Sequence, residues 1–212
     1  TGDLTVRDAL YLRRIEFPSL SWIGGQLRVE RAPVLKDVVF DKLHTIRGTL
    51  AIVDVAAEQL SLDELSTIGG GMTINDVDAE HLDLRSFQKA QSVAIDQNRF
   101  LKSFVLASSA ANTGGAVVDG NFSVSRNLLL ESVNITSVRT VRGSMMLNDN
   151  PFLQTIVVDT ETPGTVGGHL FITGNARAQC YALLTTADTL SVAGTTTIHG
   201  LECTFGDRAA LK

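Results

Sequence analysis

A short pattern of alternating apolar and polar residues returns at regular intervals along the whole chain. Each copy begins with a polar residue or glycine, followed by an apolar residue, one residue of any kind and a second apolar residue. Because successive side chains of a strand point to opposite faces, each copy predicts a short β-strand with one buried face. The copies centre on residues 4–6, 27–29, 50–52, 72–74, 93–95, 122–124, 145–147, 170–172 and 196–198.

The spacing of the copies indicates the architecture. The shortest step runs from residue 71 to 92 and the longest from 92 to 121, which leaves no room for a full helix, two strands and their turns. Each repeat also carries a second apolar patch, as at residues 35–38, and a third before a closing glycine, as at residues 43–48. Three apolar patches predict a triangular coil, whose faces are buried only when coils stack about 4.8 Å apart.

We therefore expect an all-β fold, a right-handed parallel β-helix or solenoid of about nine coils. In this interpretation residues 1–212 form a single solenoid, with residues 176–212 as a C-terminal capping coil region. An α/β leucine-rich horseshoe is the alternative fold. The valine, isoleucine and phenylalanine of the second patch favour strands over helices at that position.

A column of asparagines supports the register of the coils. The residue six places after the coil start is alanine or valine in the first four coils and asparagine in the next four. Stacked asparagine side chains both donate to and accept from the backbone at a corner, so they predict a structural ladder. A polar binding strip is the alternative interpretation. The ladder residues are Asn98, Asn127, Asn150 and Asn175.

Two segments resemble the repeat of a known family. Residues 95–101 read Ile-Asp-Gln-Asn-Arg-Phe-Leu and residues 147–153 read Leu-Asn-Asp-Asn-Pro-Phe-Leu. Both look like the repeat of receptor L domains, the leucine-rich, β-helical ligand-binding modules of insulin- and epidermal-growth-factor-type receptors. A related form occurs in fungal GPI-anchored cell-wall proteins. The resemblance covers nearly the whole chain and implies a β-helical fold at the cell surface.

Composition and charge exclude several classes of partner. The net charge of −5 is spread along the chain, so no basic patch argues for a nucleic acid or an anionic membrane. Apolar runs such as residues 128–130 are far shorter than a membrane span, so we expect no transmembrane segment. The pattern is already under way at Thr1, which predicts that an upstream segment has been removed.

Two surfaces are candidates for binding a partner. Extra residues at one offset in coils five, seven and eight predict a ridge of small polar loops, although surface loops also tolerate insertions without a function. On the outward column of the first strands, Met146 beside Phe171 predicts an apolar spot, although isolated surface apolar residues are ordinary. The partner-binding candidates are Met146, Phe171, Asn112, Thr113, Glu161 and Thr162.

The cysteines and the sequons favour an extracellular location. Cys180 and Cys203 fall at similar offsets in coils eight and nine, which predicts a disulfide. The bond would close a loop of about 24 residues and stabilise the last coil by roughly 3 kcal/mol. Two free buried thiols are the alternative. Asn121 and Asn134 begin Asn-X-Ser/Thr sequons and are glycosylation candidates.

The acidic and histidine residues give little support to catalysis. Asp54 and Asp76 share an offset in adjacent coils with Asp78 nearby, and such a group could bind calcium or act as acid and base. No lysine or arginine aligns with them as a base. The histidines lie at unrelated offsets, so no nucleophile–His–Asp set or metal-ligand spacing emerges. We predict no catalytic residue, no metal and no cofactor.

The sequence therefore favours a non-catalytic extracellular recognition or adhesion module that binds a protein or glycan partner. It would be secreted or anchored through segments outside this chain, with end-to-end or sheet-face self-association as a further possibility. A structural cell-wall or surface-coat protein is the first alternative function. A polysaccharide-degrading β-helix enzyme is the second.

Overall fold

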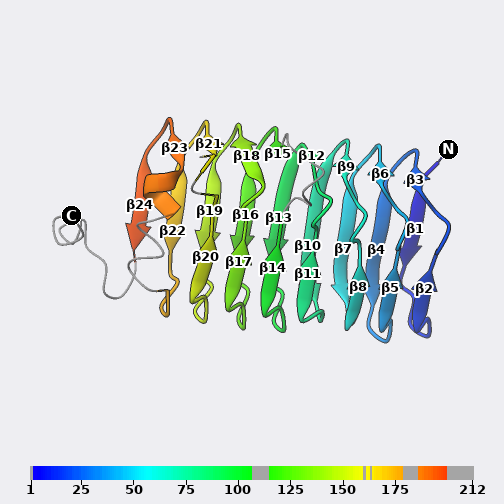
Figure 1. The fold of residues 1–212 in the computed structure, drawn as a ribbon. Coiled ribbons are helices and arrows are strands. Elements are labelled where there is room, and N and C mark those ends of the chain that lie inside the picture. Colours follow the sequence, from blue (N-terminus) through cyan, green and yellow to red (C-terminus); the bar gives the residue numbers. More distant parts are fainter. Residues whose placement is uncertain (1, 107–114, 160, 163, 179–185, 200–212) are drawn as a thin grey trace.

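The computed structural model describes residues 2–106, 115–159, 161–162, 164–178 and 186–199. Within these ranges the chain winds into a right-handed parallel β-helix whose coils stack into a rod. Figure 1 shows the coils in order, from the blue N-terminal end to the red C-terminal end. Among the described residues, one helical turn at 186–189 is the exception to an all-β body. The predicted fold class is confirmed.

The first side of the rod is a parallel sheet in which each strand pairs with its counterpart in the next coil. Leu27 pairs with Leu50 and Val29 with Ile52, so the apolar residues of each copy stack inward, as the alternation predicts. The strands are β1 (Leu4–Arg7), β4 (Leu27–Ala32), β7 (Leu50–Val55), β10 (Gly71–Val77), β13 (Ser92–Asp96), β16 (Phe122–Ser125), β19 (Met145–Asn148), β22 (Leu170–Thr173) and β24 (Thr196–His199).

The predicted second and third apolar patches form the other two sides. The second side holds β2 (Arg14–Glu16), β5 (Asp37–Val39), β8 (Gln59–Ser61), β11 (His81–Asp83), β14 (Ser103–Val105), β17 (Ser132–Asn134) and β20 (Thr155–Val157). The third holds β3 (Trp22–Ile23), β6 (Thr45–Ile46), β9 (Thr67–Ile68), β12 (Lys89–Ala90), β15 (Ala116–Val118), β18 (Val138–Val141), β21 (Thr165–Val166) and β23 (Ser191–Val192). All of their pairings are parallel.

Inward side chains from the three sides meet in one continuous core. In the second coil Leu27, Val38 and Ile46 come from different sides and have no exposed surface. The ring of Phe104 lies 6.3 Å from that of Phe122, which joins the second side of one coil to the first side of the next. Because each coil buries its neighbours, burial of apolar surface between coils stabilises the rod.

The corner between the first and second sides turns on a residue in the left-handed region of φ. That residue stands five places after the coil start, and its φ lies between 51° and 68° in the first eight coils. Aspartate tolerates this conformation, but arginine and glutamine gain nothing from it, so stacking imposes the turn. The residues are Asp8, Arg31, Asp54, Asp76, Gln97, Arg126, Asp149 and Gly174.

The second side is divided into two ladders, because β8 ends one and β11 begins the next. The corners of coils three and four are shorter than those beside them. Residues 55–58 and 77–80 link the left-handed residue to the second strand there, whereas residues 32–36 and 98–102 do so in coils two and five. The divide therefore falls where two short corners lie side by side.

Candidate functional site

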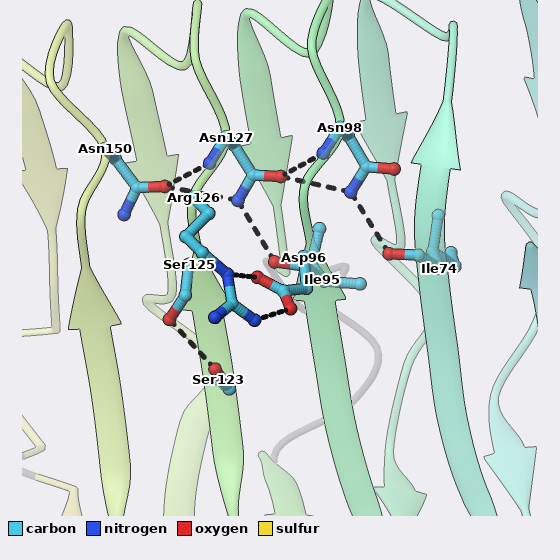
Figure 2. A network of polar contacts seen from close by, with 9 residues as sticks. All are labelled: Ile74, Ile95, Asp96, Asn98, Ser123, Ser125, Arg126, Asn127 and Asn150. Carbon is cyan, nitrogen blue, oxygen red and sulfur yellow. Dashed lines mark hydrogen bonds and ion pairs between the residues drawn. The ribbon is translucent and has the colours of Figure 1, made fainter. Parts of the chain in front are cut away.

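The four asparagines lie one above another, buried behind the corner, as Figure 2 shows for three of them. The Oδ1 atom of Asn127 accepts hydrogen bonds from the backbone N–H and the Nδ2 atom of Asn98, both at 3.0 Å. The Nδ2 atom of Asn127 donates to the Ile95 carbonyl at 3.0 Å. Asn150 repeats these bonds toward Asn127. The amides therefore satisfy backbone groups inside the rod and are not available as a binding strip.

The ladder begins where backbone pairing through the corner stops. Ala32 pairs with Val55, and Val55 with Val77, because β4, β7 and β10 run past the left-handed residue. From β13 onward the strands end before the corner, and the Oδ1 atom of Asn98 accepts from the Val77 N–H at 3.0 Å. The backbone N–H groups at this corner are thus satisfied by backbone pairing in the N-terminal coils and by asparagine side chains in the C-terminal coils.

Charged side chains cover the outside of the same corner. Arg31 binds Asp8 of the preceding coil through two hydrogen bonds, of 2.6 and 3.0 Å. Arg126 likewise binds Asp96, as Figure 2 shows. Such exposed pairs add little to stability individually, but they hold neighbouring coils in register.

The carboxylates considered for catalysis belong to this charged column. Asp54 and Asp76 both occupy left-handed positions, in adjacent coils. The Arg99 Nε atom lies 3.9 Å from Asp76 Oδ1, and the charge of Asp54 acts on Arg31. Asp78 stands two places after Asp76, in the short corner of coil four. An ion pair therefore accounts for Asp76, and Asp54 adds its charge to the field on Arg31.

Large apolar side chains are exposed at the outermost point of this corner. They stand seven or eight places after the coil start, and Tyr11 is 91% exposed. Exposed apolar side chains that recur at one offset in several coils form a surface of the kind that contacts a partner. We call this set the corner ridge: Leu10, Tyr11, Val34, Phe100 and Leu128.

The short corners of coils three and four interrupt the corner ridge and leave a recess. The recess is a pocket of about 460 Å³ lined by Glu58, Asp78, Glu80, His81 and Phe100. Ala79 and Leu101, the chain neighbours of the lining residues, are buried in the core, and the void that they border there has a volume of only about 10 Å³. A pocket of this size with an aromatic wall and several polar groups has the general character of a small-ligand site.

Lysines from flanking coils pair with two of the three pocket carboxylates. Lys36 binds Glu58, and Lys102 binds Glu80 at 2.7 Å. The pairing raises the pKa of Lys36 and lowers the pKa of Glu80. His81 shares a hydrogen bond of 2.8 Å with the Ser103 hydroxyl through Nδ1. The walls of the pocket are therefore fixed by contacts between coils.

The predicted apolar spot on the first-sheet face is present, but its two side chains are less exposed than those of the corner ridge. Met146 pairs with Phe171 in adjacent strands, and both are only half-buried. The Phe171 ring also packs at 5.7 Å from the ring of His169. The rest of that outward column is mostly small residues. Sequence reasoning found this face and missed the corner ridge, although aligning the coils at seven and eight places after the start would have revealed it.

The loop after β20 contains the predicted residues Glu161 and Thr162, and Asp159 organises it. Asp159 accepts from the Thr162 hydroxyl, from the backbone N–H groups of Glu161 and Thr162, and from Arg139 at 2.9 Å. The hydrogen bond from Thr162, followed by that from Arg139, holds the pKa of Asp159 well below its usual range. The loop is therefore anchored to the third side of the neighbouring coil.

This anchor predicts an acid-sensitive contribution to stability. A carboxyl with a depressed folded pKa stabilises the protein above its unfolded pKa, about 3.9, and loses that contribution as the pH falls toward the folded value. Asp159→Asn should therefore lower the melting temperature at pH 7, and the difference from wild type should shrink between pH 4 and pH 2. Thermal unfolding followed by circular dichroism measures both. Glu161→Gln, which removes a nearby charge, is the control, and a constant difference across this range would contradict the prediction.

The remaining predicted residues are spread over the molecule. Asn121 is exposed just before β16, and Asn134 is half-buried at the end of β17, where its Oδ1 accepts from the Thr136 N–H. Both stay glycosylation candidates. Cys180, Cys203, Asn112 and Thr113 lie outside the described residues. The disulfide and that part of the loop ridge therefore remain predictions.

The histidines do not come together. His44 interacts with Glu64 at 3.6 Å, His81 lines the pocket, and His169 accepts from the Thr195 N–H. Among the residues that the structure describes, no group of three or more histidine, cysteine, aspartate or glutamate side chains could hold a metal ion. In the same ranges, no helix has the length and apolarity needed to cross a membrane.

Comparison with models of protein families, with curated proteins and with solved structures finds no match to this chain. The resemblance to receptor L domains stays a prediction from the repeats at 95–101 and 147–153.

Proposed function

We propose that this chain is a non-catalytic recognition module that acts at the cell surface or in secreted form and binds a protein or glycan partner along its corner ridge. The observation that carries this proposal is the gathering of Leu10, Tyr11, Val34, Phe100 and Leu128 on one edge of the rod. A partner that covers this edge removes apolar surface from water, which is the main driving force for association.

The rest of the structure supports the presentation of that edge to a partner. The amides of the asparagine ladder are turned inward, and the charged column is paired between coils. Contacts between coils therefore fix the backbone beneath the ridge, and an ordered surface loses less conformational freedom on binding. The similarity of the repeats to receptor L domains is consistent with an extracellular ligand-binding module.

A panel of immobilised extracellular protein domains and oligosaccharides, read by biolayer interferometry, tests the proposal. We expect at least one partner to bind, and the triple variant Leu10→Ser, Tyr11→Ser, Val34→Ser to weaken that binding at least tenfold. Met146→Ser is the control, because it removes an apolar side chain from the first-sheet face. If Met146→Ser alone abolished binding, the ridge would be the wrong surface. If no partner bound at 100 µM protein, the recognition function itself would fail.

A structural cell-wall or surface-coat protein is the second candidate. It is favoured by the regularity of the first side, where one parallel sheet runs through all the coils from β1 to β24. Repeats that stack in this way form an extended rod suited to a structural role. Sedimentation velocity between 5 and 500 µM separates the two functions, because a coat protein is expected to form higher assemblies and a recognition module to stay of constant mass.

A further inference from the structure

The recess in the corner ridge has the features of a specific ligand site. Its lining comes from three successive coils, with Glu58 from coil three, Asp78, Glu80 and His81 from coil four, and Phe100 from coil five. We propose that this pocket binds one or two units of a neutral saccharide. The inference rests on the proposed recognition function and assigns it a ligand class and a location.

The shape of the pocket follows from the chain. Each of coils three and four lacks one residue between the left-handed corner residue and the second strand, whereas coil five has the longer corner. The longer corner carries Phe100 past the short ones, so its ring stands at the side of the hollow. The volume of about 460 Å³ falls within the range of roughly 300–1,000 Å³ that is typical of small-ligand sites.

Phe100 supplies the apolar contact that a sugar ring needs. It is 47% exposed, although its neighbour Leu101 is buried in the core, so the ring is held at the surface by the corner itself. The faces of a pyranose carry C–H groups with partial positive charge, which pack on the negative face of an aromatic ring. An exposed phenylalanine at the wall of a polar pocket fits such a face.

The carboxylates favour hydroxyl groups over a cation. Glu58 and Glu80 are paired with Lys36 and Lys102, so their charges are largely offset and the excess negative charge of the pocket comes from Asp78. In the described part of the chain Asp78 makes no ion pair, and its acceptor oxygens are available to a ligand. Carboxylate acceptors and a histidine nitrogen suit the many O–H donors of a saccharide, and the adjacent lysines disfavour an ammonium ligand.

Isothermal titration calorimetry with cellotetraose, laminaritetraose, chitotetraose and mannotetraose tests this inference, with spermidine as the cationic probe. We expect one of the tetrasaccharides to bind with a Kd in the micromolar range, with less than a twofold change in Kd between 50 and 500 mM NaCl. Phe100→Ala should weaken that binding at least tenfold, and Asp78→Asn several-fold. Phe17→Ala is the matched control, since Phe17 is a 39% exposed phenylalanine of the first coil that belongs neither to the corner ridge nor to the pocket lining.

The outcomes separate the pocket from the wider function. The pocket would be the wrong site if a tetrasaccharide bound Phe100→Ala and Asp78→Asn as tightly as wild type and left the NMR amide resonances of residues 78–81 unchanged. The proposed recognition function would still hold in that case. If spermidine bound, more weakly at high salt, and no tetrasaccharide did, the ligand class of the pocket would be a cation and the saccharide inference would be wrong. No tetrasaccharide binding at 5 mM would overturn the saccharide inference, whereas the protein-domain panel would still test recognition. Release of new reducing ends from a bound tetrasaccharide would show catalysis and overturn the non-catalytic function.

Discussion

Asn127→Ala is expected to lower the free energy of unfolding by about 4 kcal/mol, because each buried polar group that loses its partner costs about 1–3 kcal/mol. The Oδ1 atom of Asn127 is the acceptor for both the backbone N–H and the Nδ2 group of Asn98. Truncation also removes the donor that reaches the Ile95 carbonyl. All of these groups lie inside the rod. Urea unfolding followed by circular dichroism gives the value.

Val55→Ala is the matched control for this variant. Val55 occupies the same corner position in coil three, is equally buried, and its coil pairs through the corner with backbone bonds alone. Its truncation removes two methyl groups and no hydrogen bond, so we expect a loss of about 2 kcal/mol. Equal losses for the two variants would mean that the amide ladder contributes nothing beyond its volume.

The strands of the first side could be predicted because one physical rule determines them. Alternating apolar residues, repeated at a spacing too short for a helix, bury their faces only by stacking in register. The observed pairs Met72–Val93 and Ile74–Ile95 follow directly from the aligned copies. The asparagine ladder followed from the same alignment. One asparagine at a fixed offset in each coil lies beside the asparagine of the neighbouring coil, where the two side chains can form a hydrogen bond.

The corner geometry was less accessible to sequence reasoning. The steps from residue 49 to 71 and from 71 to 92 are shorter than the preceding ones, so missing residues were visible in the spacing. Their location was not, because a residue can be lost at any of three corners. Only the register of β5 with β8 and of β11 with β14 places one missing residue of each coil between the left-handed residue and the second strand. The pocket depends on that location.

Side-chain exposure was harder still to predict. Phe100 and Phe104 stand four places apart in one coil, yet the first is exposed and the second is fully buried. Corner residues do not alternate, so a period of two gives no information about which way they point. For the same reason the sequence indicated the first-sheet face, where alternation is clear, and did not reveal the corner ridge.

The first hydrogen bond of the asparagine ladder and one wall of the pocket lie at the same junction, between coils four and five, but they depend on different features of the corner. Coil four carries Val77 with a short corner, and coil five carries Asn98 with a long one. Where the strand runs through the corner, the backbone pairs directly; where it stops, an amide must enter from the next coil. Corner length is a separate feature, because coil two combines a long corner with direct pairing of Ala32 and Val55, so the longer corner of coil five explains the position of Phe100 and not the ladder.

Gly48→Ala is expected to destabilise the fold by about 3 kcal/mol, at the upper end of the cost of overpacking. A Cβ atom at Gly48 would lie 2.8 Å from the carbonyl carbon and oxygen of Gly25 and 2.9 Å from the nitrogen of Gln26, all backbone atoms of the preceding coil. Gly48 also donates its N–H to the Gly25 carbonyl at 2.8 Å, so relief of the clash would break this bond. Gly71→Ala is the control, because its Cβ would meet only the Ser92 hydroxyl at 2.6 Å, and that side chain can rotate away. Urea midpoints that coincide for the two variants would show that close backbone approach at the third corner does not set the spacing of the coils.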